Sequence, residues 1–218
     1  MAAFDSAYLL ARLRTFTERD SDDELLTEPL GYELLADAQR AAVLDIAARV
    51  PHAMMGAPVL LTSADGGSTY TFGTDDDGNA AFVVGHCEVY ARDGGQTLYA
   101  SSYGDGEGDF VIEGDRIRIP RGQSRTFTTG PYARVQKVPL LLNASVAPVL
   151  TPVWGRMVIV YGAWQRFAAI AGLRDDRQPQ ELYDRELGKI LLGLKTQFST
   201  YGYPAGLRAR RPWWEDLD

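Results

Sequence analysis

Few residues in this chain are of the types that carry metal or nucleophilic chemistry, and they are not spaced as ligands. The chain has two histidines, His52 and His86, and a single cysteine, Cys87. His86 and Cys87 are adjacent, and adjacent side chains in a strand point to opposite faces. Zinc binding and cysteine–histidine catalysis both need side chains that converge. The sequence therefore favours an ordinary strand pair over a metal or catalytic site.

Carboxylates gather at residues 75–77, followed by Gly78 and Asn79. A calcium loop of the EF-hand type needs glycine at its sixth position and glutamate at its twelfth. Counted from Asp75, those positions hold Ala80 and His86. The pattern predicts an acidic hairpin turn instead of a calcium site.

A second acidic group, Asp105, Glu107 and Asp109, alternates with glycines. Paired carboxylates are the groups that hydrolyse glycosides. Such catalysis needs a fixed separation between the two carboxyl groups, which a glycine-rich loop does not provide. The glycines do not match a dinucleotide-binding or phosphate-binding loop either. We therefore expect a solvated turn, no catalytic residue and no cofactor.

The C-terminal tail is the stretch whose residue types most clearly indicate binding. It contains Arg208, Arg210, Arg211, Pro212, Trp213 and Trp214. Arginine and large aromatic side chains are the usual anchors of protein interfaces. Two adjacent tryptophans cannot both be buried by one local helix face. Two alternatives stay open: the tail folds back onto its own chain, or, as we favour, it docks into a neighbouring subunit or partner.

Composition limits the class of protein. The chain has 218 residues, of which 45% are hydrophobic and 23% charged, and its formal net charge is -7. These values are typical of a soluble globular protein of one domain or two small ones. The negative charge argues against a general nucleic-acid binder, yet it suits a surface that DNA passes without sticking.

Targeting signals and cysteine pairing are also absent from the sequence. One cysteine cannot form a disulfide within the chain, and the N-terminus lacks the basic and apolar regions of a signal peptide. The most apolar stretch, residues 157–163, is too short to cross a bilayer as a helix. We therefore expect an intracellular protein with no membrane partner.

Two helices are predicted before residue 56. Residues 4–17 form a short helix with Tyr8, Leu9, Leu13 and Phe16 on one side. Ser21 and Glu24 fit a capping box. A longer helix has Pro29 in its first turn and ends at Val50, before Pro51. The helical spacing of its apolar residues predicts a buried seam of Leu35, Ala38, Ala42 and Ile46, with Glu33, Asp37 and Arg40 on the far side.

From residue 57 onward the pattern changes to short β-strands separated by turns, and six to eight strands are expected. Residues 87–92 and 96–101 are expected to form a hairpin. The clearest hairpin lies within residues 108–131, where Gly114 and Asp115 are the turn signal. This turn pairs Glu113 with Arg116, Ile112 with Ile117, Val111 with Arg118 and Phe110 with Ile119. The four apolar residues then share one face, and Glu113 and Arg116 form an ion pair.

Helical periodicity returns after Pro148 and Pro152. Residues 154–171 predict a buried helix, and a loop containing Pro179 follows it. The last helix has a buried stripe at Tyr183, Leu187, Ile190, Leu194 and Phe198. Neither helical part alone has enough apolar surface for a core, so both are expected to form one bundle.

The predicted class is therefore α+β, a helical bundle with an inserted antiparallel β-sheet or sandwich. Residues 1–56 hold the N-terminal helices, 57–147 the β insert, 148–200 the C-terminal helical hairpin, and 201–218 an extended tail.

This combination resembles the head-to-tail adaptor, or connector, proteins of tailed bacteriophages. The resemblance lies in the short N-terminal helix, in the helix of residues 23–51, in the insert with GDFVIEGDRIRIPRG and GPYARVQKVP, and in the closing helical hairpin. It spans nearly the whole chain as a pattern of elements, and the family has no catalytic motif to match. The β insert is longer than in the smallest adaptors, which leaves its contacts open.

The resemblance implies a structural virion subunit at the head–tail interface, assembled in the host cytoplasm. Its partners would be further copies in a ring, typically dodecameric, the portal protein and a neighbouring tail or stopper protein, with DNA passing through the lumen. Residues 208–214 would dock on the portal. One alternative is a stopper or tail-completion ring one level lower. Another is a carbohydrate-binding or hydrolytic β module that presents Tyr70, Tyr90, Tyr99 and Tyr103 on an open sheet face.

Overall fold

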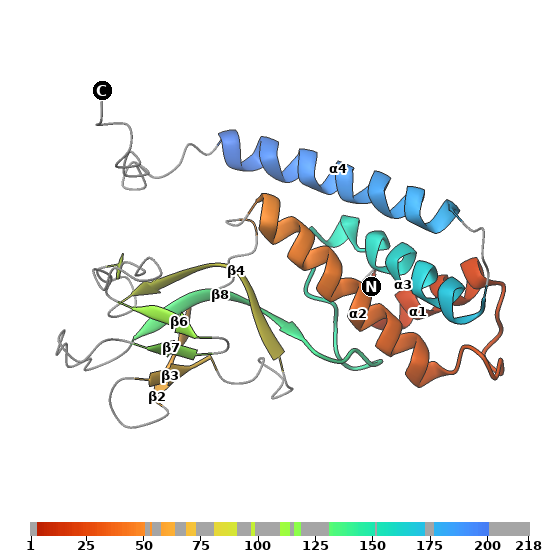
Figure 1. The fold of residues 1–218 in the computed structure, drawn as a ribbon, viewed down its shortest axis with the longest axis horizontal. Helices are drawn as coiled ribbons and strands as arrows, with labels where there is room; N and C mark the ends of the chain where they lie inside the picture. The colour runs from red at the N-terminus through yellow and green to blue at the C-terminus, as the bar shows by residue number, and fades with distance from the viewer. Residues whose placement is uncertain are drawn as a thin grey trace.

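The computed structural model shows a helical bundle at one end and a β body, strands β1 to β8, at the other (Figure 1). It describes residues 4–50, 53, 58–63, 69–72, 81–90, 97–98, 110–113, 116–118, 131–150, 152–172 and 177–200. The helices come from both ends of the chain and the strands from its middle. This is the α+β class expected from the sequence.

The first two helices begin and end close to their predicted bounds. Helix α1 spans Ser6–Thr17, and Asp5 caps it by accepting a hydrogen bond from the Tyr8 amide at 2.7 Å. Helix α2 spans Glu28–Arg49 with a proline in its first turn, as predicted, and Val50 as its C-cap. Proline fits there because the first helical amides have no intrahelical acceptor.

The capping box predicted at Ser21 and Glu24 is wrong. Both residues precede α2, whose N-cap is Thr27, and the Ser21 hydroxyl donates to Asp22 instead. Asp23 supplies the local cap: its Oδ1 accepts hydrogen bonds from the amides of Leu25 at 2.8 Å and Leu26 at 3.0 Å. A carboxylate two or three residues before a free amide competes well for this role, which the serine pattern did not reveal.

The C-terminal half of the bundle contains a 3₁₀ turn, η2 (Val153–Gly155), and helices α3 (Met157–Ile170) and α4 (Gln178–Thr200). Trp154 was expected inside the buried helix, but it lies in η2 and is 54% exposed. Pro179 was expected in a loop, but it lies in the first turn of α4. The predicted stripe of α4 is buried at Tyr183, Leu187, Ile190 and Leu194, whereas the side chain of Phe198 lies outside the described residues.

All four helices share one hydrophobic core. The predicted seam of α2 is fully buried at Leu35, Ala38, Ala42 and Ile46. It packs with the buried residues of α1, α3 and α4 in a single cluster. The prediction that the two ends of the chain form one bundle is confirmed.

Glycine at position 162 allows three helices to approach closely. A Cβ atom built on Gly162 would lie 3.1 Å from the Cβ of Ala38 in α2 and 3.3 Å from Cε2 of Tyr183 in α4. Neither neighbour yields easily, because one is attached directly to a helix backbone and the other is a hydrogen-bonded ring. The small residues of α2 and α3 therefore set the spacing of the bundle.

The β body has two four-stranded sheets in which every described strand pair is antiparallel. One sheet has the order β1-β8-β4-β5 and the other β2-β3-β7-β6. The strand bounds are β1 Pro58–Leu60, β2 Thr62–Ser63, β3 Thr69–Thr71, β4 Ala81–Tyr90, β5 Thr97–Leu98, β6 Val111–Glu113, β7 Arg116–Arg118 and β8 Tyr132–Pro139. Val89 and Val135 from the first sheet and Tyr70 and Ile117 from the second bury one another in a second core.

The predicted hairpin register is confirmed where the structure describes it. Glu113 pairs with Arg116, Ile112 with Ile117, and Val111 with Arg118. Phe110 and Ile117 are buried, and Arg116 and Arg118 are exposed, as the alternation requires. The turn residues, Ile119 and the side chain of Glu113 lie outside the described residues.

The hairpin expected at residues 87–101 is also confirmed, because Val89 pairs with Leu98 and Tyr90 with Thr97. Its first strand, however, is longer than expected. The short runs around residues 81–84 and 87–90 form one strand, β4, whose register with β8 shifts between Val84 and Glu88. Such a shift bends a strand, which lets β4 pair with β8 along most of its length.

Strand β8 and the segment after it join the two cores. Ala133 and Val135 are buried in the β core, whereas Val138, on the opposite face of the strand, is buried in the bundle core. Residues 140–150 then return over the bundle without regular secondary structure. The backbone of this segment is held by side chains: Ser6 donates to the Val146 carbonyl and Gln39 accepts from the Val149 amide at 3.0 Å.

Replacing Gly162 with alanine tests whether bundle spacing depends on this contact. We expect Gly162→Ala to lower the free energy of unfolding by about 1–3 kcal/mol, because the added methyl group forces packed helices apart. The matched control is Gly188→Ala in α4, where a Cβ meets nothing within 4 Å. That change should stabilise the protein by up to about 1 kcal/mol through helix propensity. Denaturant unfolding of both variants gives the comparison; equal effects would contradict the close-approach role.

Candidate partner-binding surfaces

The predicted docking residues, Arg208, Arg210, Arg211, Pro212, Trp213 and Trp214, lie outside the described residues. So do His52 and the acidic groups at 75–77 and 105–109. His86 and Cys87 belong to the shifted part of β4, and their side chains are not described. Among the residues that the structure describes, no group of three or more histidine, cysteine, aspartate or glutamate side chains could hold a metal ion.

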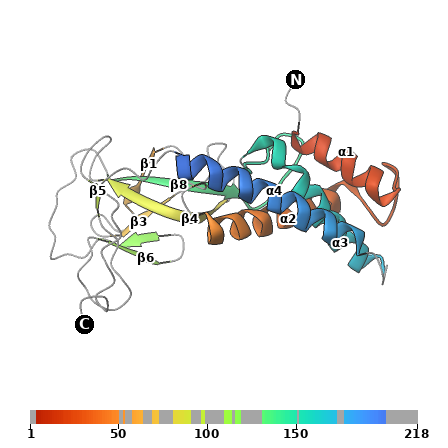
Figure 2. The ribbon, with the colours of Figure 1, turned by 90° about the horizontal axis from the view of Figure 1, so that it is seen from above.

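Helix α4 is the element that leads into the tail, and a buried hydrogen bond holds it against α2. The Tyr183 hydroxyl donates to Oδ2 of Asp45 at 2.9 Å. Burial, together with the hydrogen bond and the negative charge of Asp45, raises the pKa of Tyr183 well above its ordinary value. The C-terminal end of α4 points towards the β body (Figures 1 and 2). The position of Thr200, where the described part of the chain ends, therefore depends on this contact.

The outer side of α1 carries aromatic rings around an arginine. Arg12 is exposed, and its guanidinium carbon lies 5.7 Å from the ring centre of Tyr8 and 5.9 Å from that of Phe16. Tyr8 continues the row by an edge contact with Phe4, at 5.4 Å between ring centres. Phe16 stacks on Trp164 of α3, also at 5.4 Å. We name the side formed by Phe4, Tyr8, Arg12 and Phe16 the α1 flank.

Sequence reasoning placed Tyr8 with the buried residues Leu9 and Leu13, but Tyr8 is 38% exposed. Leu10 takes a buried place instead, against Gly31 of α2. The signal for the α1 flank was present in the sequence: Tyr8, Arg12 and Phe16 recur every four residues, which places them on one side of a helix. The spacing alone did not show whether that side of the helix faces the core or the solvent.

The outer side of α2 carries a carboxylate and a leucine. Glu33 is exposed, and Leu44 is 53% exposed between the small residues Ala41 and Ala48. Asp37 lies on the same side and forms an ion pair with Arg40. We name the side formed by Glu33, Asp37, Ala41, Leu44 and Ala48 the α2 flank.

Trp154 is a further exposed aromatic residue. Its indole lies over α4, where a Cβ on Gly193 would meet the ring at 3.5 Å. The neighbouring Gly155 is buried because Ile190 occupies the space that a side chain would need, at 2.6 Å. Helix α4 thus holds the η2 turn in place and leaves one side of the indole in solvent.

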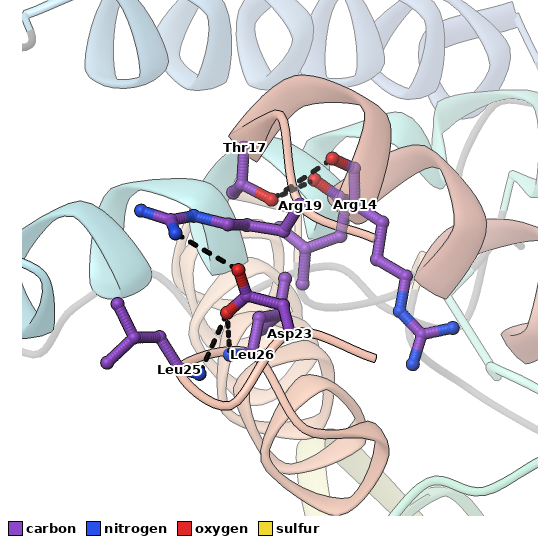
Figure 3. Close-up of polar contacts among 7 residues, drawn as sticks. Arg14, Thr17, Arg19, Asp23, Leu25 and Leu26 are labelled. Atoms are coloured by element: carbon purple, nitrogen blue, oxygen red, sulfur yellow. Dashed lines mark hydrogen bonds and ion pairs between the residues drawn. The ribbon is translucent and has the colours of Figure 1, made fainter. Parts of the chain in front are cut away.

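The turn between α1 and α2 is a polar corner (Figure 3). Arg19 donates to Oδ2 of Asp23 at 3.0 Å, and its guanidinium lies over the ring of Phe167. Burial alone would raise the pKa of Asp23, but the hydrogen bonds from Arg19, Leu26 and Leu25 outweigh it and hold the pKa below its ordinary value. Glu18 ends α1 with a left-handed φ of 54°.

A shallow depression beside this corner is lined by Ala11, Arg14, Thr15, Glu18, Arg19, Asp20 and Ser21. Cations and carboxylates alternate along it, and Arg19 is already paired with Asp23. The interactions of the corner close the α1–α2 turn, so we assign it a structural role.

No protein-family model and no curated protein sequence matches this chain. None of the described helices combines the length and the apolar composition needed to cross a bilayer.

Removing the Tyr183 hydroxyl tests the contact that positions α4. Below about pH 10, Tyr183→Phe should lower the free energy of unfolding by about 1 kcal/mol, because the hydrogen bond to Asp45 is lost. A raised pKa in the folded state means that only the unfolded tyrosine ionises as the pH passes 10. The contribution is therefore complete below pH 10 and declines above it, by about 1.4 kcal/mol per pH unit.

Unfolding of the wild type and Tyr183→Phe at pH 8 and pH 11 measures this difference. The difference in free energy of unfolding between the wild type and Tyr183→Phe should shrink or change sign at pH 11. Tyr32, whose pKa is also raised by burial, is present in both proteins and cancels. Tyr8→Phe, at an exposed residue, serves as control. A deficit of the same size at both pH values would contradict the assigned contact.

Proposed function

We propose that this chain is a structural subunit of the connector that joins the portal of a tailed-phage capsid to the tail. The observation that carries the proposal is the bundle formed by α1 and α2 with α3 and α4 across an inserted β body. This is the arrangement of elements that the resemblance to head-to-tail adaptor proteins implies. In this role the subunits form a ring, and DNA passes through its lumen.

Exposed aromatic and aliphatic side chains support a protein that assembles with others. Trp154, Leu44 and Leu192 are 54%, 53% and 69% exposed, and Tyr8 stands beside Arg12 on the α1 flank. Scattered apolar residues occur on any protein surface, but aromatic rings next to arginine are typical of interface anchors. The proposed ring offers partners for such residues on several sides of each subunit.

The tail, residues 201–218, is proposed to dock on the portal. It follows α4 directly, and α4 is anchored to α2 through Tyr183 and Asp45. Arginines and paired tryptophans would then be carried to a partner from a rigid helix. A stopper or tail-completion ring one level lower in the connector is the second candidate in the same class, and it would bind a different neighbour through the same tail.

One of the four tyrosines that the carbohydrate-binding alternative requires is not on an open sheet face. Tyr70 is 8% exposed and packs in the β core, so its ring cannot form an open platform for a sugar. The side chain of Tyr90, and the whole of Tyr99 and Tyr103, lie outside the described residues. We therefore do not carry this alternative forward as a proposal.

Deleting residues 206–218 tests the docking role of the tail. The truncated chain should keep its bundle, because no described core residue lies beyond Leu194. It should unfold at the same temperature as the full chain and lose binding to the portal protein. Pull-down with purified portal and imaging of assembled particles give the readout.

A full-length Trp213→Ala, Trp214→Ala variant is the matched control, because it keeps the length and charge of the tail. We expect it to weaken portal binding at least tenfold, as loss of aromatic anchors does. Normal portal binding by both variants would exclude the tail as the docking segment. Absence of portal binding by the full-length chain would overturn the proposed function itself.

A further inference from the structure

We propose that the α1 flank of one copy of this chain binds the α2 flank of a second copy, with Arg12 of the first copy paired to Glu33 of the second. The proposal deepens the proposed function, since it names the contact between subunits of the ring. Its basis is the chemistry and the placement of the two flanks on the bundle.

The two flanks are complementary in charge. Arg12 has no carboxylate partner among the described residues, and Glu33 has no cationic partner among them. On the α2 flank Arg40 already pairs with Asp37, so Glu33 is the carboxylate left for a partner. A cation held over aromatic rings and an exposed carboxylate are a favourable pair once water between them is displaced.

The flanks are also complementary in their apolar parts. Tyr8 and Phe16 stand on either side of Arg12, whereas the α2 flank offers Leu44 between two alanines. Large rings pack closely against a surface of small residues with one projecting leucine. The α1 flank covers about three helical turns and the α2 flank about four, so their lengths are comparable.

The exposed residues of the two flanks do not pair within one molecule. Helices α1 and α2 pack against each other through Leu10 and Gly31, but no ion pair joins Arg12 to Glu33 in the described part of the chain. Leu9 and Leu13 of α1 and Leu35 and Ala42 of α2 fill the shared core, and Phe4 and Phe16 pack against it, whereas Tyr8, Arg12, Glu33 and Leu44 are exposed. A second copy is therefore the source of the complementary flank that the chain itself provides.

Contacts between two different surfaces of identical subunits are head-to-tail. In such a pair one copy still has its α2 flank free and the other its α1 flank, so addition continues until the subunits close a ring or extend as a filament. Two different flanks on each subunit thus predict assemblies larger than dimers. A self-complementary surface on a single edge would stop at two copies.

Charge reversal tests the pairing with the full-length chain. Arg12→Glu and Glu33→Arg each place like charges opposite one another in the proposed contact. Each single variant should raise the dissociation constant for self-association at least tenfold. The double variant, which restores the opposite charges in exchanged positions, should return it to within about threefold of the wild type. Native mass spectrometry and sedimentation velocity measure these changes.

Lys195→Glu in α4 is the control, because it changes an exposed charge outside both flanks. Exposed substitutions should leave folding intact, which circular dichroism and the melting temperature verify. Leu44→Ser is an independent test of the apolar part, and it should weaken association without altering net charge.

The proposal is overturned if the wild-type chain stays monomeric at about 100 μM, if the single reversals associate normally, or if the double variant does not recover. Binding to the portal protein is measured separately on the same variants. Self-association through these flanks without portal binding would sustain this inference and contradict the proposed function. Portal binding by a chain that does not self-associate would support the proposed function and contradict this inference.

Discussion

The close approach of α2 and α3 is the contact on which the rest of the structure depends. Ala38 and Ala42 of α2 and Gly162 of α3 carry little or no side chain, so the two helices come together where larger residues would hold them apart. Their packing joins segments separated by the whole β body. It also positions α4, since Tyr183 reaches both Gly162 and Asp45.

The β body depends on the bundle through a short connection. Strand β8 places Val135 in one core and Val138 in the other, and β4 contacts α2. Residues 140–150 have no ladder or helix to satisfy their backbone groups, so Ser6, Gln39 and Arg156 supply hydrogen bonds from the bundle. Because buried backbone groups need partners, these side chains stabilise the path that the chain takes between its two parts.

Much of the bundle's exterior is consistent with assembly. The aromatic rings around Arg12 and the exposed Trp154 are held by neighbouring helices, so they do not have to become ordered on binding. A rigid anchor loses less conformational entropy when a partner arrives. In the proposed connector, the two flanks and the tail would let one subunit contact copies of itself and the portal through different surfaces.

The sequence determined the elements with the strongest periodicity. It predicted the proline in the first turn of α2 and the end of that helix to within a residue, the buried stripe of α4 and the register of β6 with β7, because repeated apolar spacing and a two-residue turn restrict the chain locally. It did not predict that Asp23 caps the α1–α2 turn or that Trp154 lies outside α3. Those outcomes depend on which of several competing local interactions the surrounding structure favours.

Only the tertiary structure decided which sides of the helices stay exposed. Tyr8 and Leu9 are neighbours in sequence, yet one is exposed and the other fully buried, because α3 and α2 cover only part of α1. Arg12 and Glu33 are a candidate pair between two copies because both are exposed and neither has an ion-pair partner among the described residues. The spacing of residues in the sequence predicts which side chains share a helix face. The packing of helices from distant parts of the chain determines what each face contacts.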